Sequence, residues 1–171
     1  MKIDTNDPSL FLYKILKSQG LDFFVSVPCS LLAELIKLVE NDNNITYTPV
    51  TREEEGLGIL SGAYLCGKKP AIIMQNSGLG NCINAITSLV NFFELQIIFI
   101  VSHRGSDGEK IDAQKPMGNI TKELFELDGI ECKEILNTNE LNLIKKTIVK
   151  NYDNGKSMAF LFPLSFWNEI E

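Results

Sequence analysis

This sequence is poor in the residues that hold metal ions in small proteins. Its 171 residues include one histidine, His103, and four cysteines, no two of which form a Cys-x-x-Cys pair. A structural zinc ion needs four cysteine or histidine ligands at short spacings. The sequence therefore argues against a zinc centre and predicts no metal-binding residues. Isolated cysteines are instead typical of small buried thiols in a reducing compartment, which predicts a cytoplasmic protein.

Long apolar runs and an excess of positive charge are also missing. The longest apolar runs, such as residues 97–101, are too short to span a bilayer. The N-terminus carries Asp4 and no apolar signal segment, so export is not expected. Lysine and arginine number 16 against 22 acidic residues, which gives a net charge of −6 without a basic stripe. The sequence therefore predicts neither a membrane nor a nucleic acid as a partner.

The composition that remains is that of an ordinary soluble protein. Apolar residues make up 44% and charged residues 22% of the chain. The length is enough for one domain to bury a full core without disulfides or a structural metal. Since no repeat, linker or low-complexity tract interrupts the chain, residues 1–171 are expected to form a single domain.

Short apolar runs alternate with helical patterns along the whole chain. Runs that are apolar along their full length favour strands of a parallel sheet that is covered on both faces. We therefore predict an α/β fold, with a single doubly wound, mainly parallel six-stranded sheet and helices on both faces. The predicted strands are residues 23–27, 45–50, 70–75, 96–102, 131–135 and 158–162. The predicted helices are residues 8–19, 31–39, 53–65, 82–90, 119–127 and 140–152.

Two helix starts carry recognisable capping residues. Asp7 followed by Pro8 combines a capping acid with proline in the first helical position. Ser30 is expected to cap the second helix. In parallel sheets, ligands bind beyond the carboxyl ends of the strands, so the candidate segments are the loops that follow those ends. They are residues 28–29 and 51–54, a glycine-containing turn at 76–81, and a long polar loop at 103–118.

Two nucleotide-binding motifs are nearly present, and both fail. Residues 78–83 follow a strand and open a helix, but Ile83 stands where the dinucleotide fingerprint needs glycine. Residues 62–69 resemble a P-loop, but Lys69 replaces the Ser or Thr that binds magnesium, and the segment lies between a helix and a strand. A nucleotide-binding domain stays an alternative that these departures disfavour.

Two groups of charged residues fall in the candidate loops. Glu53, Glu54 and Glu55 form an acidic first helical turn that the helix dipole stabilises. Because the triplet directly follows a strand, at least one carboxylate should lie at the ligand edge of the sheet, where it can hold or relay a proton. Arg104 ends another strand, and its guanidinium could bind an anionic group through a forked contact.

Several segments together resemble the pyrimidine-binding domain of thiamine-diphosphate enzymes, over nearly the whole chain. The resemblance is strongest to 2-oxo acid decarboxylases that act on phosphonopyruvate or sulfopyruvate. The long loop is most similar to those sulfopyruvate decarboxylases in which this domain is a separate alpha subunit, which implies a lyase that makes sulfoacetaldehyde during coenzyme M biosynthesis. The resembling segments are 51–56, 61–64, 69–70 and 74–81, and, in the loop, 102–105, 108–110 and 113–118.

The resemblance implies roles for particular residues. In the family, a glutamate ten positions before a tyrosine hydrogen-bonds N1′ of the aminopyrimidine and relays a proton there. Counting back from Tyr64 gives Glu54 as the catalytic residue, with Glu53 and Glu55 as helix-surface residues. The remaining cofactor-binding residues implied are Pro28, Asn76, Ser77 and Gly78. The substrate candidates are Arg104, Lys110 and Gln114, with Lys115 beside them.

The family's second domain is missing from this chain. That domain holds the diphosphate through magnesium with a Gly-Asp-Gly motif and a later asparagine, and no Gly-Asp-Gly occurs here. The resemblance therefore implies a hetero-oligomer in which a beta subunit carries the diphosphate-binding domain and the magnesium. The implied substrate is a small anionic 2-oxo acid. Alternatives are a phosphonopyruvate decarboxylase subunit and a non-catalytic subunit that retains the fold.

Overall fold

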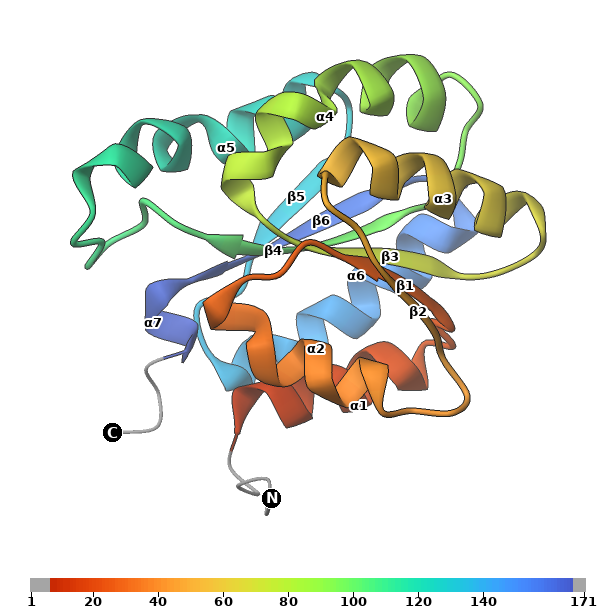
Figure 1. Ribbon diagram of the computed structural model, residues 1–171, viewed down its shortest axis with the longest axis horizontal. Coiled ribbons are helices and arrows are strands. Elements are labelled where there is room, and N and C mark those ends of the chain that lie inside the picture. The colour runs from red at the N-terminus through yellow and green to blue at the C-terminus, as the bar shows by residue number, and fades with distance from the viewer. Residues whose placement is uncertain (1–6, 168–171) are drawn as a thin grey trace.

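A parallel β-sheet forms the centre of the molecule, between two layers of helices (Figure 1). The computed structural model describes residues 7–167, and within them the sheet has six strands in the order β2-β1-β3-β4-β6-β5. Every neighbouring pair is parallel, which confirms the predicted doubly wound α/β fold. The strands are β1 (Phe23–Ser26), β2 (Thr46–Pro49), β3 (Pro70–Gln75), β4 (Ile98–His103), β5 (Glu131–Glu134) and β6 (Met158–Pro163).

Helices cover both faces of the sheet, as Figure 1 shows. One face carries α1 (Pro8–Ser18), α2 (Ala33–Glu40) and α6 (Leu141–Asp153). The other carries α3 (Glu53–Leu65), α4 (Leu79–Ala85) and α5 (Lys115–Leu127), and α4 continues as a π-helical segment, Ile86–Asn91. A short helix, α7 (Leu164–Trp167), follows the last strand and was not predicted. Within residues 7–167, no helix is long and apolar enough to cross a membrane.

The sheet divides the core of the described chain into two apolar clusters. Alternate residues of one strand point to opposite faces. In β3, Ala71 and Ile73 join the cluster under α1, α2 and α6, whereas Ile72 and Met74 join the cluster under α3, α4 and α5. All four side chains are fully buried, and burying a large aliphatic side chain stabilises the fold by roughly 1.5–3 kcal/mol. A central strand that is apolar on both faces is therefore what this architecture requires.

The first helix begins as predicted, and the second does not. The Asp7 carboxylate accepts a hydrogen bond from the Ser9 backbone N–H at 2.8 Å, and Pro8 occupies the first helical position. Ser30, predicted to be a cap, instead begins a 3-10 turn, Ser30–Leu32, and α2 starts at Ala33. The Ser30 prediction is therefore wrong, because the serine lies inside the first turn rather than before it.

Two segments that were predicted to be irregular contain helical turns. Residues 76–81, predicted to be a glycine-containing turn, form a 3-10 turn, Asn76–Gly78, that runs into α4. The predicted loop 103–118 contains a 3-10 turn, Asp112–Gln114, and ends when α5 starts at Lys115. This helix start was not predicted because Gly118, so close to it, disfavours a helix. The missing side chain of Gly118 has a packing reason, since an added Cβ would lie 2.7 Å from the backbone of Gly105.

Two glycines of α3 give a matched pair of stability variants. A Cβ added to Gly56 would lie 2.8 Å from Val25 Cγ1 and 3.3 Å from Ile72 Cδ1, whereas no atom of the described residues lies within 4 Å of a Cβ added to Gly58. Gly56→Ala should cost about 1–3 kcal/mol through overpacking. Gly58→Ala should stabilise the chain by about 0.5–1 kcal/mol through helix propensity. Urea unfolding followed by circular dichroism measures both, and equal effects would contradict the packing argument.

Candidate functional site

The candidate site lies where the three central strands of the sheet reach their carboxyl ends. β3 lies between β1 and β4, and Gln75 at the end of β3 is in register with Ser102 of β4. Cys29, which follows β1, completes this row, with its Sγ 3.2 Å from Ser102 Oγ. Because parallel strands end at one edge of the sheet, the loops after them meet here.

Glu53 directs its carboxyl group toward the loop after β3. A Cβ added to Gly78 would lie 2.1 Å from both Cδ and Oε1 of Glu53, so the carboxyl group occupies the space that the glycine leaves. Within residues 7–167 the Glu53 carboxylate has no hydrogen-bond or ion-pair partner. The expectation that Glu53 is a helix-surface residue is therefore wrong. Its carboxylate is held at the sheet edge, at the N-terminus of α3, with its oxygens unpaired.

The other two acids of the triplet have partners outside this loop. Glu54 Oε1 lies 2.9 Å from Arg52 Nη2, and the two side chains are 37% and 63% exposed. The Glu55 carboxylate accepts hydrogen bonds from the Thr51 backbone N–H and Oγ1 at 3.3 and 3.2 Å, which stabilises the start of α3. Catalysis by Glu54, predicted from the count to Tyr64, stays a prediction, and the geometry favours its neighbour Glu53.

Asn76 ties the loop after β3 to the rest of the site. Its side chain is buried, and its Nδ2 donates to the Arg104 carbonyl and to Thr121 Oγ1, both at 2.9 Å. Its Oδ1 accepts from the Arg104 backbone N–H at 3.0 Å. Asn76 therefore positions the loop that contains Ser77 and Gly78, and both N–H donors of its side chain are already used. Pro28 is exposed after β1, and its predicted place beside the cofactor stays a prediction.

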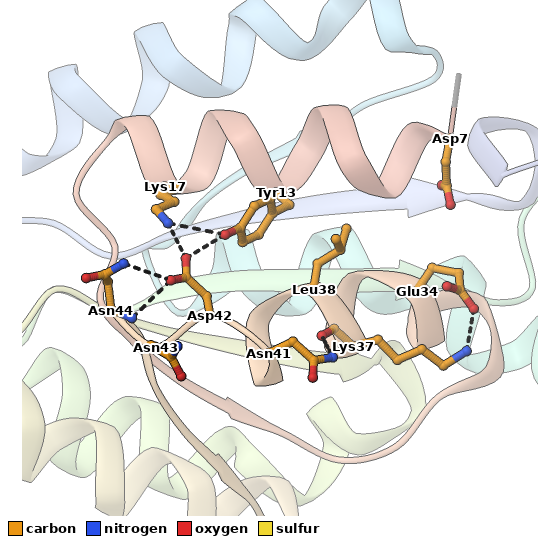
Figure 2. A pocket seen from close by; sticks show the side chains of 10 residues that line it. All are labelled: Asp7, Tyr13, Lys17, Glu34, Lys37, Leu38, Asn41, Asp42, Asn43 and Asn44. Atoms are coloured by element: carbon orange, nitrogen blue, oxygen red, sulfur yellow. Dashed lines mark hydrogen bonds and ion pairs between the residues drawn. The ribbon is translucent and has the colours of Figure 1, made fainter. Parts of the chain in front are cut away.

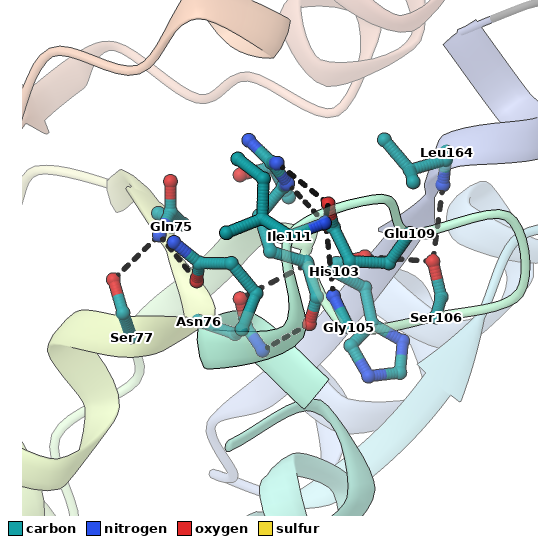
Figure 3. Close-up of polar contacts among 12 residues, drawn as sticks. Gln75, Asn76, Ser77, His103, Gly105, Ser106, Glu109, Ile111 and Leu164 are labelled. Atoms are coloured by element: carbon teal, nitrogen blue, oxygen red, sulfur yellow. Dashed lines mark hydrogen bonds and ion pairs between the residues drawn. The ribbon is translucent and has the colours of Figure 1, made fainter. Parts of the chain in front are cut away.

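His103 lies at the end of β4 (Figure 3), and its ring contacts residues of two other elements, β5 and α5. Its Nδ1 lies 3.1 Å from Glu134 Oε1, and its Nε2 lies 3.0 Å from the Gly118 carbonyl oxygen. Both partners are acceptors, so the arrangement is complete only when both ring nitrogens carry a proton. Burial lowers the pKa of His103, but the hydrogen bonds to Glu134 and Gly118 outweigh it and raise the pKa above the ordinary value of 6.5.

Arg104 is engaged within its own loop. Its Nε and Nη2 donate to the two carboxylate oxygens of Glu109 at 2.6 and 2.9 Å, and the Glu109 side chain is only 2% exposed. Glu109 also accepts from the backbone N–H groups of Gly105 and Ile111. The hydrogen bond to Arg104, followed by those backbone bonds, lowers the pKa of Glu109 to about 2. The predicted contact of Arg104 with a substrate anion therefore has no support in the geometry.

The other substrate candidates differ in whether their side chains already have ion-pair or hydrogen-bond partners. Lys110 is exposed and has no partner among the described residues. Lys115 pairs with Asp112 at 2.6 Å on the surface. Gln114 accepts a hydrogen bond from Gln75 Nε2 at 3.3 Å, which brings the end of the long loop to the end of β3. Sequence reasoning assigned no role to Gln75, although a polar residue that ends an apolar strand is a usable signal.

A separate groove of about 560 Å³ lies between α1 and α2, and none of the candidate residues lines it (Figure 2). Its charged groups satisfy one another. Asp42 pairs with Lys17 and accepts from Tyr13, which holds the pKa of Asp42 well below its usual range, and Lys37 pairs with Glu34. The groove therefore offers no unpaired catalytic group. Nor do the residues 7–167 bring together three or more histidine, cysteine or acidic side chains that could hold a metal ion.

The raised pKa of His103 predicts a pH-dependent contribution to stability. The contribution should be fully present below pH 6.5, where the unfolded histidine is also charged, and should be lost as the pH rises through the folded-state pKa. His103→Gln should therefore lower Tm by roughly 3 °C or more near pH 6 and by less at alkaline pH. Thermal melts from pH 5.5 to 8.5 measure this. Glu134→Gln, which removes the negative charge and keeps an oxygen acceptor, should flatten the difference, and a difference that is constant with pH would contradict the assignment.

The family of this chain follows from comparison with known sequences. The family described as "Thiamine pyrophosphate enzyme, N-terminal TPP binding domain" matches residues 9–131. That match includes β1 to β4, the acidic turn of α3, the loop after β3, the whole loop after β4 and α5. The chain therefore belongs to the family of thiamine pyrophosphate enzymes, as an N-terminal-type domain.

Two individual proteins of known name are similar to this chain over nearly its full length. The chain is 53% identical over 157 residues to the sulfopyruvate decarboxylase subunit alpha of Methanococcus maripaludis, covering 91% of this chain and 94% of that protein. It is 46% identical over 160 residues to the subunit of the same name from Methanocaldococcus jannaschii, covering 93% and 95%.

A solved structure supports the fold. The thiamine diphosphate-dependent 4-hydroxybenzoylformate decarboxylase of Rhodococcus jostii superposes with a TM-score of 0.66 at 17% identity. The superposition covers 94% of this chain but 31% of the decarboxylase. At that identity the likeness concerns the fold alone.

Proposed function

We propose that this chain is the pyrimidine-binding subunit of a thiamine-diphosphate-dependent decarboxylase that converts sulfopyruvate into sulfoacetaldehyde and carbon dioxide. In this reaction the bond between the carboxylate and the carbonyl carbon breaks, and a proton takes the place of the carboxylate. The observation that carries the proposal is the unpaired Glu53 carboxylate beside Gly78, in a chain similar over nearly its full length to alpha subunits of sulfopyruvate decarboxylase. The product assigns the subunit to coenzyme M biosynthesis.

The residues at the sheet edge fit an aminopyrimidine. A ring nitrogen such as N1′ needs a partner that can hold or give a proton, and Glu53 presents a carboxylate that no side chain of the described residues engages. Gly78 adds no Cβ to the space around that carboxylate. When bound, thiamine diphosphate supplies the electron-accepting group that decarboxylation needs. Glu53 would keep a proton at N1′, and the loop positioned by Asn76 would flank the ring.

Residues 7–167 offer no site for the magnesium and diphosphate end of the cofactor. The described residues lack an acidic cluster for magnesium, and the sequence lacks Gly-Asp-Gly. We propose that a beta subunit supplies the diphosphate-binding domain and magnesium, so that the complete site forms only between the chains. The four cysteines form no disulfide bond, which supports a location in the reducing cytoplasm.

Reconstitution tests the proposed function. The purified chain alone should release no carbon dioxide from sulfopyruvate, because it holds half of the site. Adding the beta subunit, thiamine diphosphate and magnesium should restore release. A parallel reaction tests phosphonopyruvate as the alternative substrate. If the complex turns over that acid faster, phosphonopyruvate would replace sulfopyruvate as the proposed substrate. A stable complex that binds the cofactor and releases no carbon dioxide from either acid would favour a non-catalytic role.

Three isosteric variants distinguish the acids of α3. Glu53→Gln should lower kcat of the reconstituted enzyme by about 10²–10⁴-fold, the usual contribution of a positioned acid or base. Glu54→Gln and Glu55→Gln remove groups that face Arg52 and Thr51, so they should change kcat by only a few-fold. Proton exchange at C2 of bound thiamine diphosphate, followed by NMR, should slow in the Glu53 variant alone. Loss in the Glu54 variant with retention in the Glu53 variant would restore the residue predicted by the sequence count.

A further inference from the structure

The side-chain amide of Gln75 connects two loops of the candidate site. Its Nε2 donates to Ser77 Oγ at 2.7 Å and to Gln114 Oε1 at 3.3 Å (Figure 3 shows Gln75 and Ser77). An amide nitrogen carries two hydrogens, so both are used. Its Oε1 faces the Cys29 thiol at 3.9 Å. Gln75 therefore has a defined orientation, with its donors turned toward Ser77 and Gln114.

This orientation determines what the neighbours can offer to a ligand. Gln114 Oε1 is the acceptor for Gln75, so the Gln114 Nε2 group, with its two N–H donors, is turned away from Gln75. No partner for that Nε2 exists among residues 7–167. Ser77 Oγ accepts from Gln75 and keeps its own O–H to donate, and Ser77 is exposed. The unused hydrogen-bonding groups of Gln114 and Ser77 are therefore mainly donors.

A pair of neutral donors can bind an oxyanion without a direct contact from a cation. Of the cations in the long loop and at the start of α5, Arg104 already holds Glu109 in a two-point ion pair and Lys115 pairs with Asp112, whereas Lys110 is exposed and has no partner among the described residues. Hydrogen bonds between a neutral donor and a charged acceptor contribute about 1.5–3 kcal/mol, which is enough for recognition without a free arginine. Such donors can bond to the oxygens of a tetrahedral sulfonate or of a planar carboxylate.

We propose that Gln114 Nε2 and Ser77 Oγ, oriented by Gln75, form the subsite that binds an oxyanion group of the substrate. The inference rests on the proposed function, and it names the residues that recognise the anionic 2-oxo acid. Gln114 and Ser77 contact the anion, and Gln75 is a positioning residue that acts through them. The bound group is the sulfonate or the carboxylate, which share this chemistry.

Direct binding to the reconstituted, cofactor-loaded complex tests the subsite. The probes are 3-sulfopropanoate, which carries both anionic groups, ethanesulfonate and propanoate, each measured by titration calorimetry. Gln114→Glu replaces the donors with a carboxylate of similar shape and should weaken 3-sulfopropanoate binding by about 10-fold or more. It should also raise KM for sulfopyruvate with a smaller effect on kcat. The single-group probe whose binding falls identifies the anionic group.

Two further variants test whether binding depends on the orientation of Gln114 and whether an added negative charge alone explains the effect of Gln114→Glu. Gln75→Met removes the donors that orient Gln114 and should weaken binding by several-fold, with the same rise in KM. Ala113→Glu adds the same negative charge at the exposed neighbouring position and should change binding less than two-fold. Unchanged binding of all probes in both glutamine variants would overturn the subsite, as would equal effects of Ala113→Glu and Gln114→Glu. Because binding is measured directly, the subsite is tested even if the complex does not decarboxylate sulfopyruvate.

Discussion

The buried amide of Asn76 is the contact on which the candidate site depends. It is bonded to the backbone of Arg104 on both sides and to Thr121, so it joins the ends of β3 and β4 to α5. A buried amide that loses its partners costs the desolvation of each unpaired group, about 1–3 kcal/mol apiece. The loop after β3 therefore has little freedom, and the positions of Ser77 and Gly78 follow from it. The same bond fixes where the long loop departs from β4.

Helix geometry explains why one carboxylate of three meets that loop. Successive residues of an α-helix point about 100° apart, so adjacent glutamates cannot share an environment. Glu53 lies on the face of α3 that continues through Gly56, which packs against Val25 and Ile72 of the sheet. Glu54 and Glu55 turn toward Arg52 and Thr51. Glu54 and Glu55 stabilise the start of the helix through these contacts, whereas Glu53 has no such local partner among the described residues.

The same geometry sets the limit of what the sequence could predict. The strands and helices followed from apolar periodicity, because a parallel sheet covered on both faces demands continuous apolar strands such as β3 and β4. The choice among the glutamates did not follow, since a shift of one residue in a count to Tyr64 rotates the carboxylate from the loop to the surface. Residues 115–118 read as loop because proline and glycine are usually breakers, yet here the proline suits a first helical turn. The pairing of Gln75 with Gln114 spans 39 residues, and no local pattern records it.

Close backbone packing brings Gln114 back to the sheet. A Cβ added to Gly105 would lie 2.4 Å from the Gln114 carbonyl oxygen, and one added to Gly118 would lie 2.7 Å from the Gly105 backbone. Gly105 also has φ of +83°, which side chains disfavour. The loop can therefore fold back on the end of β4 only with glycine at both positions, while the Arg104–Glu109 pair closes its interior. Residues outside the proposed subsite thus decide whether Gln114 reaches Gln75. The proposed recognition of the anion consequently depends on the fold of this loop, and a larger residue at Gly105 or Gly118 would alter both together.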